Sequence, residues 1–248
     1  MSLEVQPAVE KGIDMQMVKD VIAWIGTAIG IGLNITPAVL FYKIFRKIEK
    51  YNIVPESMLI FNILCSQLWA CYWLRQNAFV PTVSSGIGTG LSILFAWIYL
   101  YVFFEGKPLY FFFSFLLVAD LVGQFYYALM YIIPLEYVGT IAMVVNIINY
   151  AAPGQNIIKV IKEGNYKLIP IVTTVFGAMC SVSWFTFGVL QKDWNCIIPN
   201  TLGMLFSAIN IITWTVFYCK AGEEKKEKEK VLIEDGVELK ENQVLNSV

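Results

Sequence analysis

The strongest constraint on this chain is that its apolar residues come in long runs without charges. An uncharged stretch of roughly 18 or more residues can cross a bilayer as one helix. Six such runs occur, and they are 21–42, 57–74, 76–104, 137–158, 168–191 and 194–219. A seventh run, 108–135, is interrupted only by Asp120. Together with a mean hydropathy of +0.62, these runs predict an all-α integral membrane protein with seven transmembrane helices.

The composition argues against several classes of protein. His is absent, which removes the usual metal ligand and proton relay. The sequence contains no G-x-x-x-x-G-K phosphate loop, and its five cysteines form no C-x-x-C pair. The net charge of −1 gives nucleic acid no basic surface. We therefore predict neither an enzyme nor a cofactor, metal or nucleic-acid site.

The Lys and Arg residues predict how the chain crosses the membrane, because they concentrate in cytosolic loops. The loops after the first, third and fifth spans hold Lys43, Arg46, Lys47, Lys50, Lys107, Lys159, Lys162 and Lys167. The other side holds Lys11, Lys19, Arg75 and Lys192. This places segment 1–20 outside and the charged, disordered tail 220–248 in the cytosol. We expect a plasma membrane location, and internal membranes stay open.

The sequence also repeats itself, and the motif Cys-Ser-x-x-Trp begins at both Cys65 and Cys180. With one gap in the alignment, the pairs are Pro37/Pro153, Lys43/Lys159, Pro55/Pro170, Cys65/Cys180, Ser66/Ser181 and Trp69/Trp184. Two three-helix units of equal orientation need one extra helix between them. The expected organisation is therefore 3+1+3, with repeats at 21–104 and 136–219 and a linker helix at 105–135.

Five segments resemble the two MtN3/saliva repeats of the SWEET sugar transporters, within the Pro-Gln-loop superfamily. They read TPAVLFYKIFRK, VPESMLIFNILCSQLWACYWL, AAPGQNIIKVIK, IPIVTTVFGAMCSVSWFTFGVLQKD and IPNTLGMLFSAIN. The resemblance covers about residues 21–219. It implies a facilitative, bidirectional uniporter that moves a mono- or disaccharide by alternating access around a midplane pocket.

Four prolines match the family's proline tetrad, which implies a hinge for the inner gate. They are Pro37, Pro55, Pro153 and Pro170. A proline inside a helix removes a backbone hydrogen bond and bends the helix. Pro55 and Pro170 lie near the starts of their spans, where an ordinary helix start is the alternative.

The resemblance also implies a substrate site. A sugar offers hydroxyls and an apolar C–H face, so it needs amide or hydroxyl partners and an aromatic platform. Trp184 and Asn200 match the family's binding Trp and Asn, and Ser66 matches a pocket-lining position. Ser85 stands where the family has a second Asn, so the expected pocket is asymmetric.

Trp69 and Asp193 match the family's outer-gate pair, in which a Tyr often faces the Asp. An indole N–H can donate to a carboxylate as a phenol does. Asp120 lies outside both repeats, either as a hydrogen-bonded structural acid or as a proton-coupling site.

Two alternatives to a sugar uniporter stay open at this point. One is a Pro-Gln-loop exporter of another small solute, such as an amino acid, with proton coupling. The other is a seven-span receptor of the same topology, although the internal repeat disfavours it. The motif G-x-x-x-G at Gly26/Gly30 and Gly86/Gly90 permits close helix packing within one chain or in a homo-oligomer.

Overall fold

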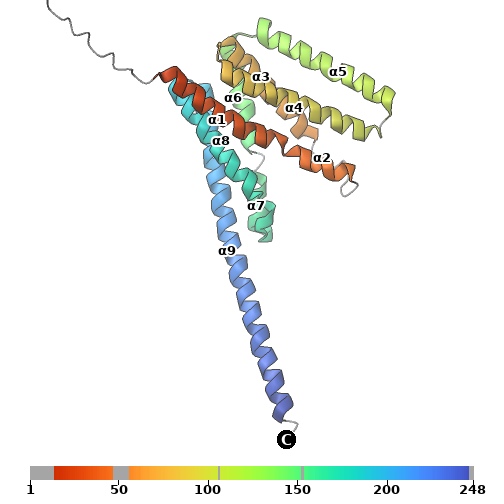
Figure 1. Ribbon diagram of the computed structural model, residues 1–248, viewed down its shortest axis with the longest axis vertical. Coiled ribbons are helices and arrows are strands. Elements are labelled where there is room, and N and C mark those ends of the chain that lie inside the picture. The colour runs from red at the N-terminus through yellow and green to blue at the C-terminus, as the bar shows by residue number, and fades with distance from the viewer. Residues whose placement is uncertain (1–13, 47–55, 106, 152–153, 246–248) are drawn as a thin grey trace, which may run out of the picture.

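The fold was analysed in a computed structural model that describes residues 14–46, 56–105, 107–151 and 154–245 (Figure 1). All regular secondary structure in these residues is helical. The α-helices are α1 (Met15–Ile35), α2 (Pro37–Phe45), α3 (Glu56–Arg75), α4 (Phe79–Phe103), α5 (Pro108–Tyr127), α6 (Leu135–Ala151), α7 (Gly154–Glu163), α8 (Ile171–Gln191) and α9 (Trp194–Leu245). A π-helix, η2 (Ala128–Ile132), extends α5, and a short 3₁₀-helix, η3 (Tyr166–Leu168), precedes α8.

Each of the seven predicted spans contains a helix or a broken pair of helices. Five stretches of the described chain are long and apolar enough to cross a membrane by themselves: α1 with α2, α4, α5 with η2, α8, and the first part of α9. The remaining two spans are α3, which is more polar, and α6, which is apolar but shorter. The predicted all-α, multi-pass membrane fold is confirmed.

The prolines behave in different ways. Pro37 is the first residue of α2, directly after α1 ends at Ile35, so it breaks the first span. Pro170 is the N-cap of α8, which is the helix start that the sequence left as an alternative. Pro55 and Pro153 lie outside the described residues. Pro199, which sequence reasoning did not weigh as a hinge, lies inside α9 and is buried.

The tail differs from its predicted disorder. Helix α9 continues without interruption from Trp194 to Leu245, so residues 220–245 extend the last span as helix (Figure 1). The segment EEKKEKEK is built from strong helix formers.

The helices pack as two equivalent triplets. In the first triplet, α4 contacts both α1 and α3, and in the second, α9 contacts both α6 and α8. Two further pairs, α1 with α8 and α3 with α6, join the triplets. If α1, α3 and α4 exchange with α6, α8 and α9, each set of contacts maps onto the other. This is the packing of two copies of one unit around a pseudo-twofold axis.

The turns inside the two triplets have the same geometry. Asn77, between α3 and α4, and Lys192, between α8 and α9, are left-handed, with φ of 58° and 59°. In each turn the next residue donates its N–H to a carbonyl five residues back, from Ala78 to Trp73 and from Asp193 to Gly188. Both are Schellman-type helix ends. Asn77 and Lys192 are separated by 115 residues, the offset that also relates Cys65 to Cys180.

The buried apolar residues form two clusters, and the larger one lies at one end of the bundle. We call the end where α1 begins and α3 ends the outer end, following the predicted orientation. The larger apolar cluster lies there and draws on both triplets, through residues such as Ala23, Trp73, Val138, Phe187 and Cys196. The second cluster lies toward the inner end and consists of Phe41, Ile44, Leu59, Phe95 and Tyr99, all from α2, α3 and α4. The triplets are therefore packed together most tightly at the outer end.

The linker helix α5 lies at the edge of the bundle, beside the first triplet (Figure 1). It contacts α4, and its π-helical end contacts α3. Arg75 fixes this end by donating from Nη1 to the carbonyls of Leu129 and Ile133, at 2.7 and 2.6 Å. None of the residues of α5 is fully buried. The helix therefore covers the outside of the first triplet and leaves the axis between the triplets free.

Candidate functional site

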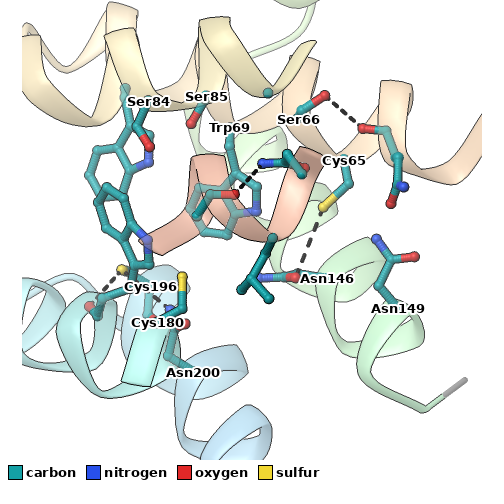
Figure 2. Close-up of a pocket in the computed structure, with 17 residues that line it drawn as sticks. Cys65, Ser66, Trp69, Ser84, Ser85, Asn146, Asn149, Cys180, Cys196 and Asn200 are labelled. Atoms are coloured by element: carbon teal, nitrogen blue, oxygen red, sulfur yellow. Dashed lines mark hydrogen bonds between the residues drawn. The ribbon is translucent and has the colours of Figure 1, made fainter. Parts of the chain in front are cut away.

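A cavity of about 380 Å³ lies between the two triplets. Both triplets contribute to its lining, through α1, α3, α4, α6, α8 and α9. The side chains used below are Asn34, Asn62, Cys65, Ser66, Trp69, Trp73, Ser85, Asn146, Asn149, Cys180, Trp184, Cys196 and Asn200. Figure 2 shows Ser66 and Ser85 facing this space from one side and Cys180, Cys196 and Asn200 from the other.

All four residues predicted to bind substrate line this one cavity: Ser66, Ser85, Trp184 and Asn200. Asn200 is buried, with 5% of its surface exposed, and its Nδ2 donates to the Cys196 carbonyl at 2.7 Å. That bond uses only the amide nitrogen, so the Asn200 oxygen can accept from a ligand hydroxyl. Ser66 Oγ donates to the carbonyl of Asn62 at 2.6 Å, so its hydroxyl oxygen remains available as an acceptor.

Four further asparagines line the cavity and were missed by sequence reasoning. They are Asn34, Asn62, Asn146 and Asn149. Each lies toward the inner end of its helix, on α1, α3 or α6. Asn34 Nδ2 donates to the Gly30 carbonyl at 3.0 Å, and the Cys65 thiol contacts Asn146 Oδ1 at 4.0 Å. Each of these asparagines lies within an uncharged run, where a buried amide is costly unless it has a partner or faces a polar cavity. This pattern could have identified them from the sequence.

The outer side of the cavity is aromatic. Trp69 stacks on Trp73 with ring centroids 5.7 Å apart and planes at 20°. Phe187 meets both Trp73 and Trp184 edge-on, at 5.6 and 5.7 Å. Gly26 permits this arrangement, because a Cβ there would lie 3.2 Å from the Trp184 ring. These rings form a roof that spans both triplets.

The cavity is electrically neutral. No Asp, Glu, Lys or Arg lines it within the described part of the chain. Its polar groups are amides, hydroxyls and thiols, which suit a ligand that offers hydroxyls and carries no charge. Asp120 lies on α5 instead, where it is exposed and accepts from Gln124 Nε2 at 2.7 Å. Asp120 therefore cannot contact a ligand in the cavity.

The outer closure differs from the predicted pair of Trp69 and Asp193. Asp193 Oδ2 accepts from the Tyr72 hydroxyl at 2.8 Å, and Asn195 Nδ2 donates to the same hydroxyl at 3.0 Å. Gln76 Nε2 makes a longer contact with Asp193, at 3.4 Å. Tyr72 lies almost one helical turn closer to the outer end of α3 than Trp69, so its hydroxyl reaches the loop while Trp69 lines the cavity. We call Tyr72, Asp193 and Asn195 the outer latch.

Two features hold the outer latch together. Asp193 precedes α9, and its Oδ1 accepts from the backbone N–H of Asn195 at 2.9 Å, so it caps that helix. Gly139 on α6 packs against the other two members. A Cβ at Gly139 would lie 2.5 Å from Tyr72 Cε2 and 2.6 Å from Asn195 Nδ2. Only a residue without a side chain fits here while the outer latch is closed.

The chain is similar to known sugar transporters in sequence, and to one of them in fold. Residues 136–222 match the MtN3/saliva family, described as a sugar efflux transporter for intercellular exchange. The bidirectional sugar transporter NEC1 of Petunia hybrida is 25% identical over 232 residues, covering 87% of this chain and 84% of its own length. For the bidirectional sugar transporter SWEET8 of Arabidopsis thaliana, the identity is 25% over 229 residues, with coverage of 87% and 95%. The solved structure of a eukaryotic SWEET transporter superposes with a TM-score of 0.71 at 17% identity, over 83% of this chain and 99% of that one.

Proposed function

We propose that this chain, which matches the MtN3/saliva family model over residues 136–222 and resembles SWEET transporters over most of its length, is a facilitative, bidirectional sugar transporter of that family. It moves a sugar across a bilayer by alternating access, driven only by the sugar's own gradient. The substrate occupies the cavity between the two triplets. At about 380 Å³ this cavity lies at the small end of the usual range for ligand pockets, roughly 300–1,000 Å³.

The observation that carries this proposal is the chemistry of the cavity. Its aromatic roof offers Trp184 and Trp69 to an apolar sugar face, and its amides and hydroxyls, led by Asn200, offer donors and acceptors to the sugar rim. The same neutrality disfavours an amino-acid exporter, whose zwitterionic substrate needs charged or strongly polarised partners. A proton-coupled cycle would also need a titratable carboxylate or His beside the substrate.

The outer latch and the uneven core support a specific state in the transport cycle. The triplets are joined at the outer end by the larger apolar cluster and by the outer latch. Lys19 adds a bridge there by donating from Nζ to Gln191 Oε1 at 2.9 Å. The structure therefore corresponds to a carrier closed on the outside. Opening to the outside requires the Tyr72–Asp193 bond to break, while bending at Pro37 accompanies closure on the inside.

The same proposal includes topology and location. The excess of Lys and Arg on one side supports an extracellular N-terminus and a cytosolic C-terminus in the plasma membrane. The repeats comprise 21–104 and 136–219, with 105–135 as the linker. Helix α5 lies at the edge of the bundle and none of its residues is fully buried, so its outer face is available to a second copy in a homo-oligomer.

Uptake of radiolabelled glucose and sucrose in cells that lack their own sugar transporters tests the proposed function. Saturable uptake and counterflow of glucose, unchanged when the proton gradient is dissipated, are expected. Counterflow that collapses with the proton gradient would contradict a uniporter. Failure to transport either sugar, in protein that reaches the membrane, would contradict sugar transport itself.

A further inference from the structure

The π-helix η2 ends in a way that its own backbone cannot complete. The N–H of Ile133 bonds to the carbonyl of Ala128, five residues back, at 2.9 Å. The next bond of this pattern would join the Leu129 carbonyl to the N–H of residue 134, but that residue is Pro134, which has no N–H. Leu129 is fully buried in the larger apolar cluster, so its carbonyl needs a partner from within the protein.

Arg75, the last residue of α3, supplies that partner. Its Nη1 donates to the Leu129 carbonyl at 2.7 Å and to the Ile133 carbonyl at 2.6 Å, and both bonds are strengthened by the charge of the guanidinium. The two carbonyls lie on either side of a boundary. Leu129 belongs to the end of the linker, whereas Ile133 lies two residues before α6 begins. One side chain of the first triplet therefore holds both the end of the linker and the chain that enters the second triplet.

The same face of α3 contacts α6 at a second point. Tyr72 lies three residues before Arg75, so the two side chains are neighbours on one face of the helix. The Tyr72 ring packs on Gly139, where a Cβ would lie 2.5 Å from its Cε2. Val138, beside Gly139, is fully buried in the larger apolar cluster. The outer end of α6 is therefore held against α3 by Arg75, before the helix begins, and by Tyr72, just over one turn into it.

From these contacts we propose that Arg75 is a positioning residue for the outer latch: it places the outer end of α6 so that Gly139 can seat Tyr72 and Asn195. The proposal rests on the proposed function, because it gives Arg75 a role in the transport cycle. Arg75 does not line the central cavity, and its hydrogen bonds in the described structure go to backbone carbonyls. Its effect on the outer latch is therefore carried by α6. Without Arg75, α6 can shift at its start, and the outer side opens more easily.

The test measures how fast a sulfonated, membrane-impermeant maleimide, added outside intact cells, modifies the three thiols that line the central cavity. The background is the full chain with Cys219→Ser, and rates are compared per molecule at the cell surface. Arg75→Ala should be modified several times faster than the background. Electrostatic steering cannot produce this result, because loss of a cation slows an anionic reagent.

A second substitution and a control support this comparison. Arg75→Gln keeps a polar side chain that ends short of both carbonyls, so it should behave as Arg75→Ala does. Glu136→Gln is the matched control. It removes one charge from the exposed first turn of α6 and leaves both bonds of Arg75 in place, so its rate should equal that of the background.

Two double variants separate positioning of the outer latch from simple capping of η2. Pro134→Ala provides an N–H for the Leu129 carbonyl, but it cannot replace the bond from Arg75 to the Ile133 carbonyl. Arg75→Ala combined with Pro134→Ala should therefore still be modified fast. Arg75→Ala should raise the rate of Tyr72→Phe by less than about twofold, because both substitutions release the same outer latch and their effects are not additive.

Background rates in Arg75→Ala and Arg75→Gln would overturn the proposal. So would a return to the background rate when Pro134→Ala is added, a full multiplication of the rates of Arg75→Ala and Tyr72→Phe, or a Glu136→Gln rate equal to that of Arg75→Ala. The labelling rates are measured without sugar. Glucose binding to the purified wild-type protein therefore tests the proposed function separately.

Discussion

Replacing Tyr72 with Phe should open the outer side of the transporter. The substitution keeps the ring inside the outer apolar cluster, where only 4% of Tyr72 is exposed. It removes the hydroxyl that donates to Asp193 and accepts from Asn195. Replacing Asp193 would be a poorer test, because Asp193 also caps α9 and its loss would destabilise that helix.

The size of the effect follows from the outer latch geometry. A hydrogen bond to a charged acceptor contributes about 1.5–3 kcal/mol. Asp193 is only partly buried, so solvent screening puts the value near the lower limit. Because the bond exists only while the outer side is closed, its loss lowers the ratio of closed to open protein. The expected shift is about tenfold toward the outward-open form.

Cysteine labelling can measure this shift, since the thiols of Cys65, Cys180 and Cys196 line the central cavity. The background variant is Cys219→Ser, which removes the exposed thiol on α9. A membrane-impermeant maleimide added outside intact cells should modify Tyr72→Phe several times faster than the background. Saturating glucose should slow the modification, because the sugar and the reagent share the cavity.

Two further variants make the result decisive. Gly139→Ala should also speed labelling, because its Cβ would lie 2.5 Å from the Tyr72 ring in the closed form. Trp69→Phe leaves the bonds of the outer latch intact, so it should label more slowly than Tyr72→Phe even though it removes part of a ring from the roof. Background rates in both Tyr72→Phe and Gly139→Ala would refute the outer latch. Fast labelling of Trp69→Phe alone would restore the gate expected from sequence.

Five other substitutions have expected outcomes. Trp184→Ala loses sugar stacking worth about 0.5–1.5 kcal/mol and should weaken glucose binding roughly two- to tenfold on purified protein; Asn200→Ala should weaken it further, and wild-type binding in both would remove the site from this cavity. Ser85→Asn supplies a second amide opposite Asn200 and should tighten glucose binding, with unchanged affinity as the contrary result. Pro37→Ala restores a backbone N–H at the break between α1 and α2 and should slow counterflow at normal surface expression. Asp120→Asn should leave uptake and its pH dependence unchanged, because Asp120 lies outside the cavity; a lost pH response would indicate proton coupling.

Much of the fold could be predicted because membranes restrict what a chain can do. Uncharged runs must become helices in lipid, since no other open structure satisfies the backbone. The resemblance to the SWEET repeats predicted Trp184 and Asn200 as substrate residues in the second repeat, and Ser66 and Ser85 in the first. All four line one cavity, as a parallel arrangement of two equivalent units requires.

The outer latch could not be predicted in the same way, because it depends on where individual side chains point when the outer side is closed. Alignment placed Trp69 at the gate, but the indole turns into the cavity and the phenol of Tyr72, almost one turn away, reaches Asp193. Spacing along a helix identifies a face, and it does not decide which residue on that face directs its polar group at a given partner. The charge of the tail predicts disorder, but Glu and Lys are also strong helix formers, and α9 continues as helix to Leu245.

The asymmetry between the repeats explains why both are needed in one chain. At the offset of 115, Tyr72 corresponds to Phe187 and Asp193 corresponds to Ala78, so each repeat carries half of the outer latch. Two identical copies of the first repeat would have the hydroxyl without its acceptor. Two copies of the second would have the carboxylate without its donor, and would leave that charge facing a phenylalanine. Fusion of the repeats lets each half diverge, so that closure on the outside depends on a bond that only the complete chain can form.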